Sequence, residues 1–240
     1  MPHDDGHGTA LDELLAFWFA PGTKPRRFAK DGAFDAELRD RFGPLAAAAA
    51  EGRLARRAGT PRGALGLVLL LDQLPRNLHR GDPRAFAQDG KARAVASAAL
   101  AAGHDAALGP DERLFLYLPF EHGEELADQE RAVGLFGRLG DPELLGYAVR
   151  HRDIVARFGR FPHRNAVLGR PSTAEELAFL EGPNSSFQHH LGTPGGSAGP
   201  RSAPRHGQRM RARPRRAISR RRTAIQSRMG RGKRDDCARR

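Results

Sequence analysis

Residues 60–75, TPRGALGLVLLLDQLP, predict a helix at the centre of the fold. Thr60 can cap this helix, and Pro61 suits its first position because the N–H that proline lacks has no partner there in any helix. Every residue between positions 64 and 71 is apolar. A helix without a polar face must be covered on all sides, so the stretch predicts a domain in which other helices surround this one. Pro75 is expected to end the helix.

The rest of the chain up to Phe187 divides into further helices, because start and stop signals recur and no segment shows the alternation of a surface strand. Thr9 and Asp31 or Asp35 are expected caps, and Pro44 is an expected kink or break. We expect an all-α fold of about eight helices in a single domain, residues 10–187, after a flexible N-terminus, residues 1–9. The remaining expected helices span roughly residues 9–20, 31–52, 82–103, 110–120, 122–140, 141–158 and 172–181.

The residues after Phe187 differ in composition from this domain. Residues 188–240 hold 16 Lys and Arg against 2 acids and no aromatic residue, whereas residues 1–187 hold 24 basic and 26 acidic residues. The net charge of +12 therefore belongs to the tail, which is expected to be disordered because it cannot bury enough apolar surface to offset its ordering entropy. Two interpretations stay open: an arm that binds nucleic acid, or the product of a shifted reading frame in GC-rich DNA. Nucleic acid is a partner only under the first.

Cysteine content and hydropathy indicate the compartment. Cys237 is the single cysteine, so the chain can form no internal disulfide, and a reducing environment is expected. The N-terminal sequence MPHDDGHGTA lacks the basic start and apolar run of a signal peptide. The longest apolar run, residues 64–71, is much shorter than the roughly 20 residues that cross a bilayer. These features predict a soluble cytoplasmic protein without a membrane partner.

Two histidines are expected on buried helical faces. In the helix expected from Pro142, His151 lies on the same stripe as Tyr147 and Val155. In the helix expected from about His122, that histidine shares a face with Gln129. Core histidines with satisfied hydrogen bonds are the simpler interpretation, and a polar site is the alternative.

Asp72 is expected in the last turn of the central helix, where the helix dipole disfavours a carboxylate. It should therefore have a partner. The candidates are Arg76 and an arginine of residues 157–164, and the pairing would tie the helix end to a loop or belong to a catalytic site. Asn77 follows in the same segment.

The segment FGRFPHRN, residues 158–165, places four polar side chains on a loop in which Pro162 fixes a turn. Guanidinium groups grip carboxylates and phosphates with two parallel hydrogen bonds, so the loop suits a planar anion. A structural clamp is the alternative. The four side chains are those of Arg160, His163, Arg164 and Asn165.

These observations predict that polar residues from three segments converge on one partly enclosed, net-positive cavity: Asp72, Arg76, His122, His151, Arg160, His163 and Arg164. The candidates for catalysis are His122, His151, His163 and Asp72. The candidates for ligand binding are Arg76, Asn77, Gln129, Arg160, Arg164 and Asn165. Neither a metal site nor a cofactor is expected, because HExxH, CxxC and phosphate-loop motifs are absent from the sequence.

Seven sequence pieces, in order and at ordinary spacing, resemble the bacterial family called domain of unknown function 924. They are FWF (17–19), KDGAFDAELRDRF (30–42), LLLDQLPRN (69–77), AFAQDGKA (85–92), LYLPFEHGEELADQ (116–129), HRDIVARFGRFPHRNAVLGRPSTAEELAFL (151–180) and GPNSSF (182–187). The resemblance covers residues 11–187. It implies an all-α fold similar to tetratricopeptide-repeat superhelices, and it implies no reaction.

Two functions remain open on the sequence. The first is a soluble helical binding module whose Arg, His and Asn cavity holds a small anionic ligand or an acidic peptide. The second is a hydrolase or phosphoryl-transfer enzyme, with or without a metal, that uses His151 or His163 as acid and base. The sequence does not decide whether the protein is an enzyme.

Overall fold

We describe the protein from a computed structural model, which defines residues 7–183 and 185. The expectations for residues 1–6 and for the tail, residues 188–240, lie outside these described residues. The α-helices are α1 (His7–Trp18), α2 (Gly32–Ala50), α3 (Pro61–Val68), α4 (Leu74–Leu78), α5 (Asp89–Ala101), α6 (Pro110–Glu121), α7 (Leu126–Leu139), α8 (Pro142–Phe158) and α9 (Ala174–Leu180).

The expected all-α fold is confirmed. A π-helical turn, Leu69–Gln73, joins α3 to α4 without a break, so the nine α-helical segments of the described residues form eight continuous helices. Short 3-10 turns occupy several of the loops, and no strand occurs in residues 7–183. Because α1 begins at His7, residues 7–9 belong to that helix rather than to a flexible N-terminus, and Thr9 is not its N-cap.

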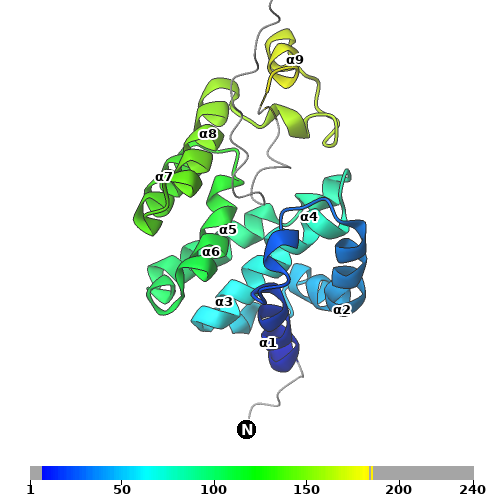
Figure 1. Ribbon diagram of the computed structural model, residues 1–240, viewed down its shortest axis with the longest axis vertical. Helices are drawn as coiled ribbons and strands as arrows, with labels where there is room; N and C mark the ends of the chain where they lie inside the picture. The colour runs from blue at the N-terminus through cyan, green and yellow to red at the C-terminus, as the bar shows by residue number, and fades with distance from the viewer. Residues whose placement is uncertain (1–6, 184, 186–240) are drawn as a thin grey trace, which may run out of the picture. The chain divides into compact units, whose positions relative to one another are not determined.

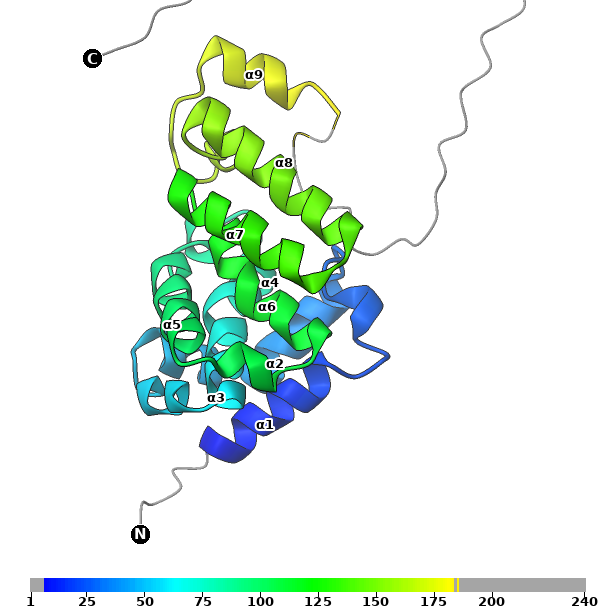
Figure 2. The ribbon, with the colours of Figure 1, turned by 90° about the vertical axis from the view of Figure 1, so that its left-hand side faces the viewer.

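The central position of α3 is also confirmed. All residues from Gly63 to Val68 are buried, and α3 packs against α1, α5 and α6. Thr60 caps α3 as expected, since its side chain accepts a hydrogen bond from the backbone N–H of Gly63. In Figure 2, α6, α7 and α8 lie side by side in chain order, with α9 beyond α8.

Pro75 does not end the central helix, which was expected to stop there. In the π-helical turn the N–H of Leu74 bonds to the carbonyl of Leu69, five residues back. This wider turn precedes Pro75, so the proline stands at the start of α4, where its missing N–H costs little. The helix therefore continues to Leu78.

Two other helix boundaries differ from the prediction. Asp31 caps α2 through the N–H groups of Ala33 and Phe34, and the helix continues past Pro44 to Ala50. The helix expected from about His122 begins only at Leu126, and His122 instead follows the last residue of α6. His122 thus reaches the interior from the end of α6.

Aromatic residues from α1, α2 and α6 meet in the main core, which consists mostly of leucine and alanine. Trp18, Phe34 and Phe115 are fully buried, and the Trp18 and Phe115 rings meet edge to face with centroids 5.5 Å apart. A smaller cluster of Ile154, Val155 and Phe161 holds the end of α8 to the loop after it. Figure 1 shows α9 beyond the helices that carry the main core.

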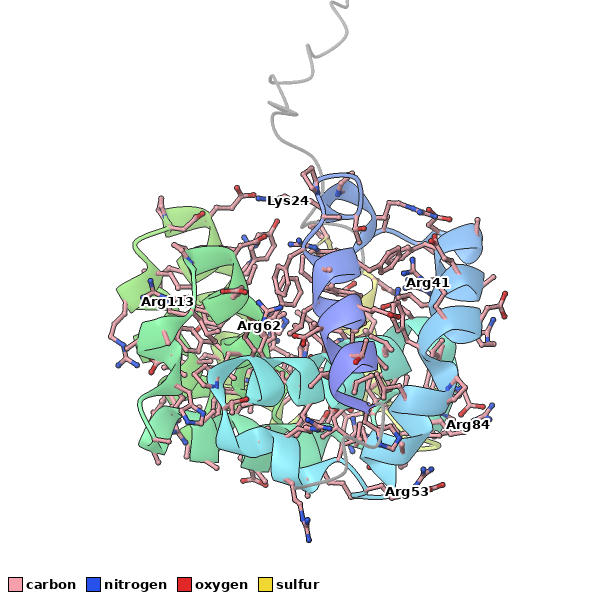
Figure 3. The ribbon with its side chains drawn as sticks, turned by 90° about the horizontal axis from the view of Figure 1, so that it is seen from below. Lys24, Arg41, Arg53, Arg62, Arg84 and Arg113 are labelled. Carbon is pink, nitrogen blue, oxygen red and sulfur yellow. The ribbon has the colours of Figure 1, made fainter. Side chains whose placement is uncertain are left out.

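Basic side chains on the face seen in Figure 3 are spread over several elements around α1 rather than gathered in one place. Those labelled are Lys24, Arg41, Arg53, Arg62, Arg84 and Arg113. Among the described residues, no helix has the length and apolar character needed to cross a membrane.

Candidate functional site

A cavity of about 170 Å³ lies where the end of α4, the end of α6, α8 and the loop after α8 meet. Its charged lining consists of Arg27, Arg76, Arg80, Arg164 and Glu121. Three histidines also line it, namely His122, His151 and His163, together with Gln73 and Asn77. The apolar part of the wall includes Phe28, Phe86, Leu118 and Tyr147.

Asp72 lies behind this lining and is fully buried. Its carboxylate accepts hydrogen bonds from His122 Nδ1 at 2.8 Å and from Gln73 Nε2 at 2.6 Å, and Arg76 Nη1 lies 3.1 Å away. Burial acts to raise the pKa of Asp72, but the positive charge of Arg76 and the hydrogen bond with His122 outweigh it and hold that pKa well below its usual range. Asp72 is therefore a buried, ionised carboxylate. The pairing with Arg76 is one of those expected.

Gln73 and Arg76 belong to the same continuous helix as Asp72, whereas His122 follows α6. Arg76 Nη1 also donates to the backbone carbonyl of Asp72 at 2.8 Å. The same guanidinium grips Asp89, at the start of α5, through two bonds of 2.9 and 3.0 Å. Arg76 thereby ties α4 to α5 and is held in one orientation at the cavity wall.

Arg164 is the most confined arginine of the loop after α8. Its side chain is 7% exposed and lies between the rings of Phe86 and Phe161, at 4.7 and 4.6 Å from the ring centroids. Nη1 donates to the carbonyl of His122 at 3.1 Å. Burial and the nearby Arg76 lower the pKa of Arg164 to about 10, so the charge of this guanidinium is incompletely compensated.

Two guanidinium nitrogens of the wall are buried and have no hydrogen-bond partner within the described part of the chain: Arg164 Nε and Arg27 Nη2. The other Arg27 nitrogens are engaged, because Nε donates to the carbonyl of Trp18 and Nη1 to Asp111. A buried donor without an acceptor costs about 1–3 kcal/mol. Both arginines line the cavity, so this cost arises at its wall.

His151 and His163 are held in different environments. His151 Nδ1 lies 2.7 Å from Glu121 Oε1 and 2.9 Å from the carbonyl of Tyr147. Because both neighbours are acceptors, Nδ1 carries the proton. Burial, with the positive charge of Arg164, lowers the pKa of His163 to about 3, so His163 is neutral at neutral pH.

The expected surplus of positive charge at the cavity is wrong. Each of the four lining arginines contacts a carboxylate that lies behind it: Arg27 with Asp111, Arg76 with Asp72 and Asp89, Arg80 with Asp35, and Arg164 with Asp89 at 3.6 Å. These carboxylates hold the guanidinium groups in place and neutralise much of their charge. The cavity wall therefore offers guanidinium N–H donors that are held in place. Their positive charge is largely balanced by the carboxylates behind them.

The structure brings most of the predicted site residues together. Six of them line the cavity, namely Arg76, Asn77, His122, His151, His163 and Arg164, and Asp72 contacts two of these from behind. Asn77 donates to Asp35 at 2.8 Å, which helps to hold α4 against α2.

The other three candidates do not line this cavity. Arg160 grips Glu176 of α9 through bonds of 2.7 and 2.8 Å. Gln129 donates to the carbonyls of Glu121 and Gly123 at the end of α6. Asn165 is fully buried and bonds to Ser172 and Arg170. Each of these side chains forms hydrogen bonds that hold parts of the fold together. The sequence pattern could not distinguish this structural role from ligand binding.

Sequence reasoning missed Arg27, Arg80 and Glu121 as lining residues. Arg27 and Arg80 lie in loops without a periodic pattern, and their carboxylate partners are 84 and 45 residues away in the chain. Glu121 was expected to follow the helix over residues 110–120, but it is the last residue of α6, directly before His122. Among residues 7–183, no group of three or more His, Cys, Asp or Glu is arranged to hold a metal ion.

These features define an all-helical protein with a small, partly enclosed cavity walled by arginine, histidine and aromatic side chains. The chain belongs to a family of bacterial proteins of unknown function, DUF924, whose model matches residues 14–184. The chain is similar to the protein of unknown function ATU0120 from Agrobacterium tumefaciens. The solved structure of that protein shows 44% identity and a TM-score of 0.69, and the match covers 74% of this chain and 99% of that chain. No curated protein matches.

The resemblance expected from the seven sequence pieces is thus confirmed. Both descriptions state an unknown function, so the family and the solved relative assign no activity to the cavity.

Proposed function

We propose that the protein is a helical binding module whose cavity holds a small anionic ligand. The observation that carries this proposal is a pair of buried donors, Arg164 Nε and Arg27 Nη2, that have no acceptor among the described residues and belong to arginines lining one cavity. An anion supplies the acceptor oxygens that these N–H groups lack. It also compensates the charge of Arg164, whose pKa is lowered to about 10 by burial and by Arg76.

The size of the cavity favours a small molecule over the acidic peptide that was the other expected ligand. A dry cavity of about 150 Å³ in another protein holds a benzene molecule, and the cavity described here measures about 170 Å³. That space holds a short carboxylic acid, but not the backbone of a peptide. The rings of Phe28 and Phe86 and the side chain of Leu118 suit the hydrocarbon part of such an acid.

The enzymatic alternative receives less support from the same residues. A general acid must carry a proton at the working pH, and His163, with a pKa of about 3, does not. His151, the other histidine considered for catalysis, has its Nδ1 already engaged by Glu121 and Tyr147.

Location and architecture belong to the same proposal. We place the binding module in the cytoplasm of a bacterium, in keeping with the family description and with the single cysteine of the sequence. We also expect tetratricopeptide-like pairing of helices, which the neighbouring packing of α6 with α7 and of α7 with α8 supports.

The proposal is tested by thermal-shift titration of the intact protein with acetate, propionate, succinate and inorganic phosphate. A ligand at a hundred times its Kd stabilises the fold by about 2.7 kcal/mol. We expect at least one of these anions to raise the melting temperature of the wild type, and Arg164→Met to abolish the shift.

Arg157→Met is the matched control. It removes the same charge from the same segment, but Arg157 is 55% exposed and pairs with Glu175 on the surface. The control should keep the wild-type shift. An absence of any shift with all four anions, or an unchanged shift in Arg164→Met, overturns the proposal.

A further inference from the structure

His122 presents one ring nitrogen to the interior and the other edge of its ring to the cavity. Nδ1 bonds to the carboxylate of Asp72, which is fully buried and does not line the cavity. The His122 side chain is 16% exposed and lines the cavity. Because Nδ1 faces inward, the edge that meets the cavity is the one that carries Nε2.

The protonation of that ring follows from its partner. Asp72 is ionised, since Arg76 and His122 hold its pKa well below its usual range against the effect of burial. An ionised carboxylate only accepts hydrogen bonds, so His122 Nδ1 must carry a proton. Burial and the charge of Arg76 lower the pKa of His122, which favours the neutral ring. A neutral ring with a proton on Nδ1 has a lone pair on Nε2, and Nε2 is therefore an acceptor.

A donor and an acceptor thus belong to two side chains that both line the cavity. Arg164 Nη1 bonds to the carbonyl oxygen of His122 at 3.1 Å, which places the two residues in contact, and Arg164 Nε is a buried donor without an acceptor among the described residues. A simple carboxylate satisfies the donor and leaves the acceptor unmatched. A ligand that carries both an anionic oxygen and a hydroxyl group matches both.

We infer that the ligand of the cavity is a small hydroxy acid, whose carboxylate accepts from Arg164 and whose hydroxyl group donates to Nε2 of His122. This inference rests on the proposed function, because it names the class of anion that the cavity binds. A site built to receive a hydroxyl group discriminates against the analogue that lacks it, since the ligand then offers no partner to the histidine nitrogen. Phe86 and Leu118 limit the remainder of the ligand to a short apolar chain.

Calorimetric titration of the intact protein with matched pairs of acids tests the inference. The pairs are lactate against propionate, and 2-hydroxybutyrate against butyrate, with both enantiomers of each hydroxy acid. We expect one enantiomer of a hydroxy acid to bind roughly three to ten times more tightly than its partner without the hydroxyl group, the effect of one neutral hydrogen bond. His122→Phe should bind both members of a pair with equal affinity.

The outcomes separate this inference from the proposed function. If the wild type binds neither member of any pair and no other anion, the proposed function fails. If it binds hydroxy acids and simple acids with equal affinity, or if His122→Phe keeps the preference, anion binding stands and the inference is overturned.

A measurement on the wild type keeps the inference testable if His122→Phe does not fold. Side-chain nitrogen chemical shifts of His122 should show a protonated Nδ1 and an unprotonated Nε2. Lactate should shift the Nε2 signal, whereas propionate should leave it in place. A protonated Nε2 in the free protein, or equal responses to the two acids, contradicts the inference.

Discussion

Arg160 and Arg164 lie four residues apart in one loop and have opposite surroundings. Arg160 meets the carboxylate of Glu176 with two hydrogen bonds, and that pair fixes α9 to the loop. Arg164 lies between two aromatic rings and keeps a buried N–H without an acceptor among the described residues. From residue type and spacing alone, both arginines were predicted to bind a ligand. The side chain that each one meets decides which is a structural tie and which is a candidate for ligand binding.

At the residue scale, His163 should make stability depend on pH. Its pKa is lowered from 6.5 to about 3 in the folded protein, mainly by burial. As the pH falls below 6.5, the unfolded chain binds a proton that the folded protein does not, so His163 favours unfolding progressively until the folded pKa is reached. The contribution is at most about 1.4 kcal/mol for each pH unit. His163→Asn should therefore lose less of its free energy of unfolding than the wild type on acidification.

Urea denaturation of both proteins at a series of pH values between neutral and mildly acidic measures this difference. The free energy of unfolding of His163→Asn, relative to that of the wild type, should increase as the pH decreases. Parallel curves for the two proteins would mean that His163 titrates normally in the folded state.

The sequence predicted the polar residues of the site better than their contacts. His151 could be identified because a polar group at a helical core position needs a partner, and Asp72 because a carboxylate expected at a helix end needs one. His122 was identified from a helix that begins only at Leu126. The partners of the arginines could not, since Arg76 meets Asp89 and Arg164 meets Phe86 only after α4, α5 and the loop after α8 have packed together. Nothing in the sequence around Asp89 or Glu176 indicates that these carboxylates pair with an arginine.

At the element scale, the π-helical turn is the main departure from the sequence prediction. A proline within a helical pattern normally marks an end, and Pro75 was interpreted in that way. The wider turn at Leu69–Gln73 precedes the proline, and the helix continues. As a result Asp72, Gln73 and Asn77 are all buried on a helix that is otherwise part of the apolar core. Such turns occur often at functional sites.

The start of α3 depends on close contact with the preceding 3-10 turn, Ala55–Gly59. A Cβ atom added at Gly63 would lie 1.9 Å from the carbonyl oxygen of Arg57, which is backbone and cannot rotate away. Gly63→Ala should therefore force the backbone apart and lower the free energy of unfolding by roughly 1–3 kcal/mol. Thermal or urea denaturation measures this loss.

Gly134→Ala is the matched control for that substitution. Gly134 lies within α7 and a Cβ atom there would meet nothing within 4 Å. Since alanine favours helix more than glycine does, this variant should gain roughly 0.5–1 kcal/mol. Equal effects of the two substitutions would contradict the close contact at Gly63.

At the scale of the whole molecule, stability should reside in the chain up to Phe187. Both hydrophobic clusters of the described residues lie between Ala10 and Phe179, and residues 188–240 contain no aromatic residue to add to them. A chain that ends at Phe187 should therefore unfold at the same temperature as the full chain. Calorimetry on the two chains measures this, and a lower melting temperature of the shorter one would contradict it.

The same two chains test the proposed nucleic-acid arm. If residues 188–240 form such an arm, only the full chain should bind DNA, and its affinity should fall steeply as the salt concentration rises. Equal DNA binding by both chains would contradict the arm, because the contact would then lie within residues 1–187. Basic and acidic residues nearly balance in that part of the chain.

The walls of the cavity come from positions between Arg27 and Arg164, which is most of the described length of the chain. A molecule held there contacts the loop after α1, the end of α4, the end of α6 and α8 at once. Opening any one of these elements breaks the enclosure, so each local opening must also release the ligand. Occupancy should therefore slow amide hydrogen exchange in α4, α6 and α8 together, and the early and late halves of the domain should behave as one cooperative unit when the cavity is filled.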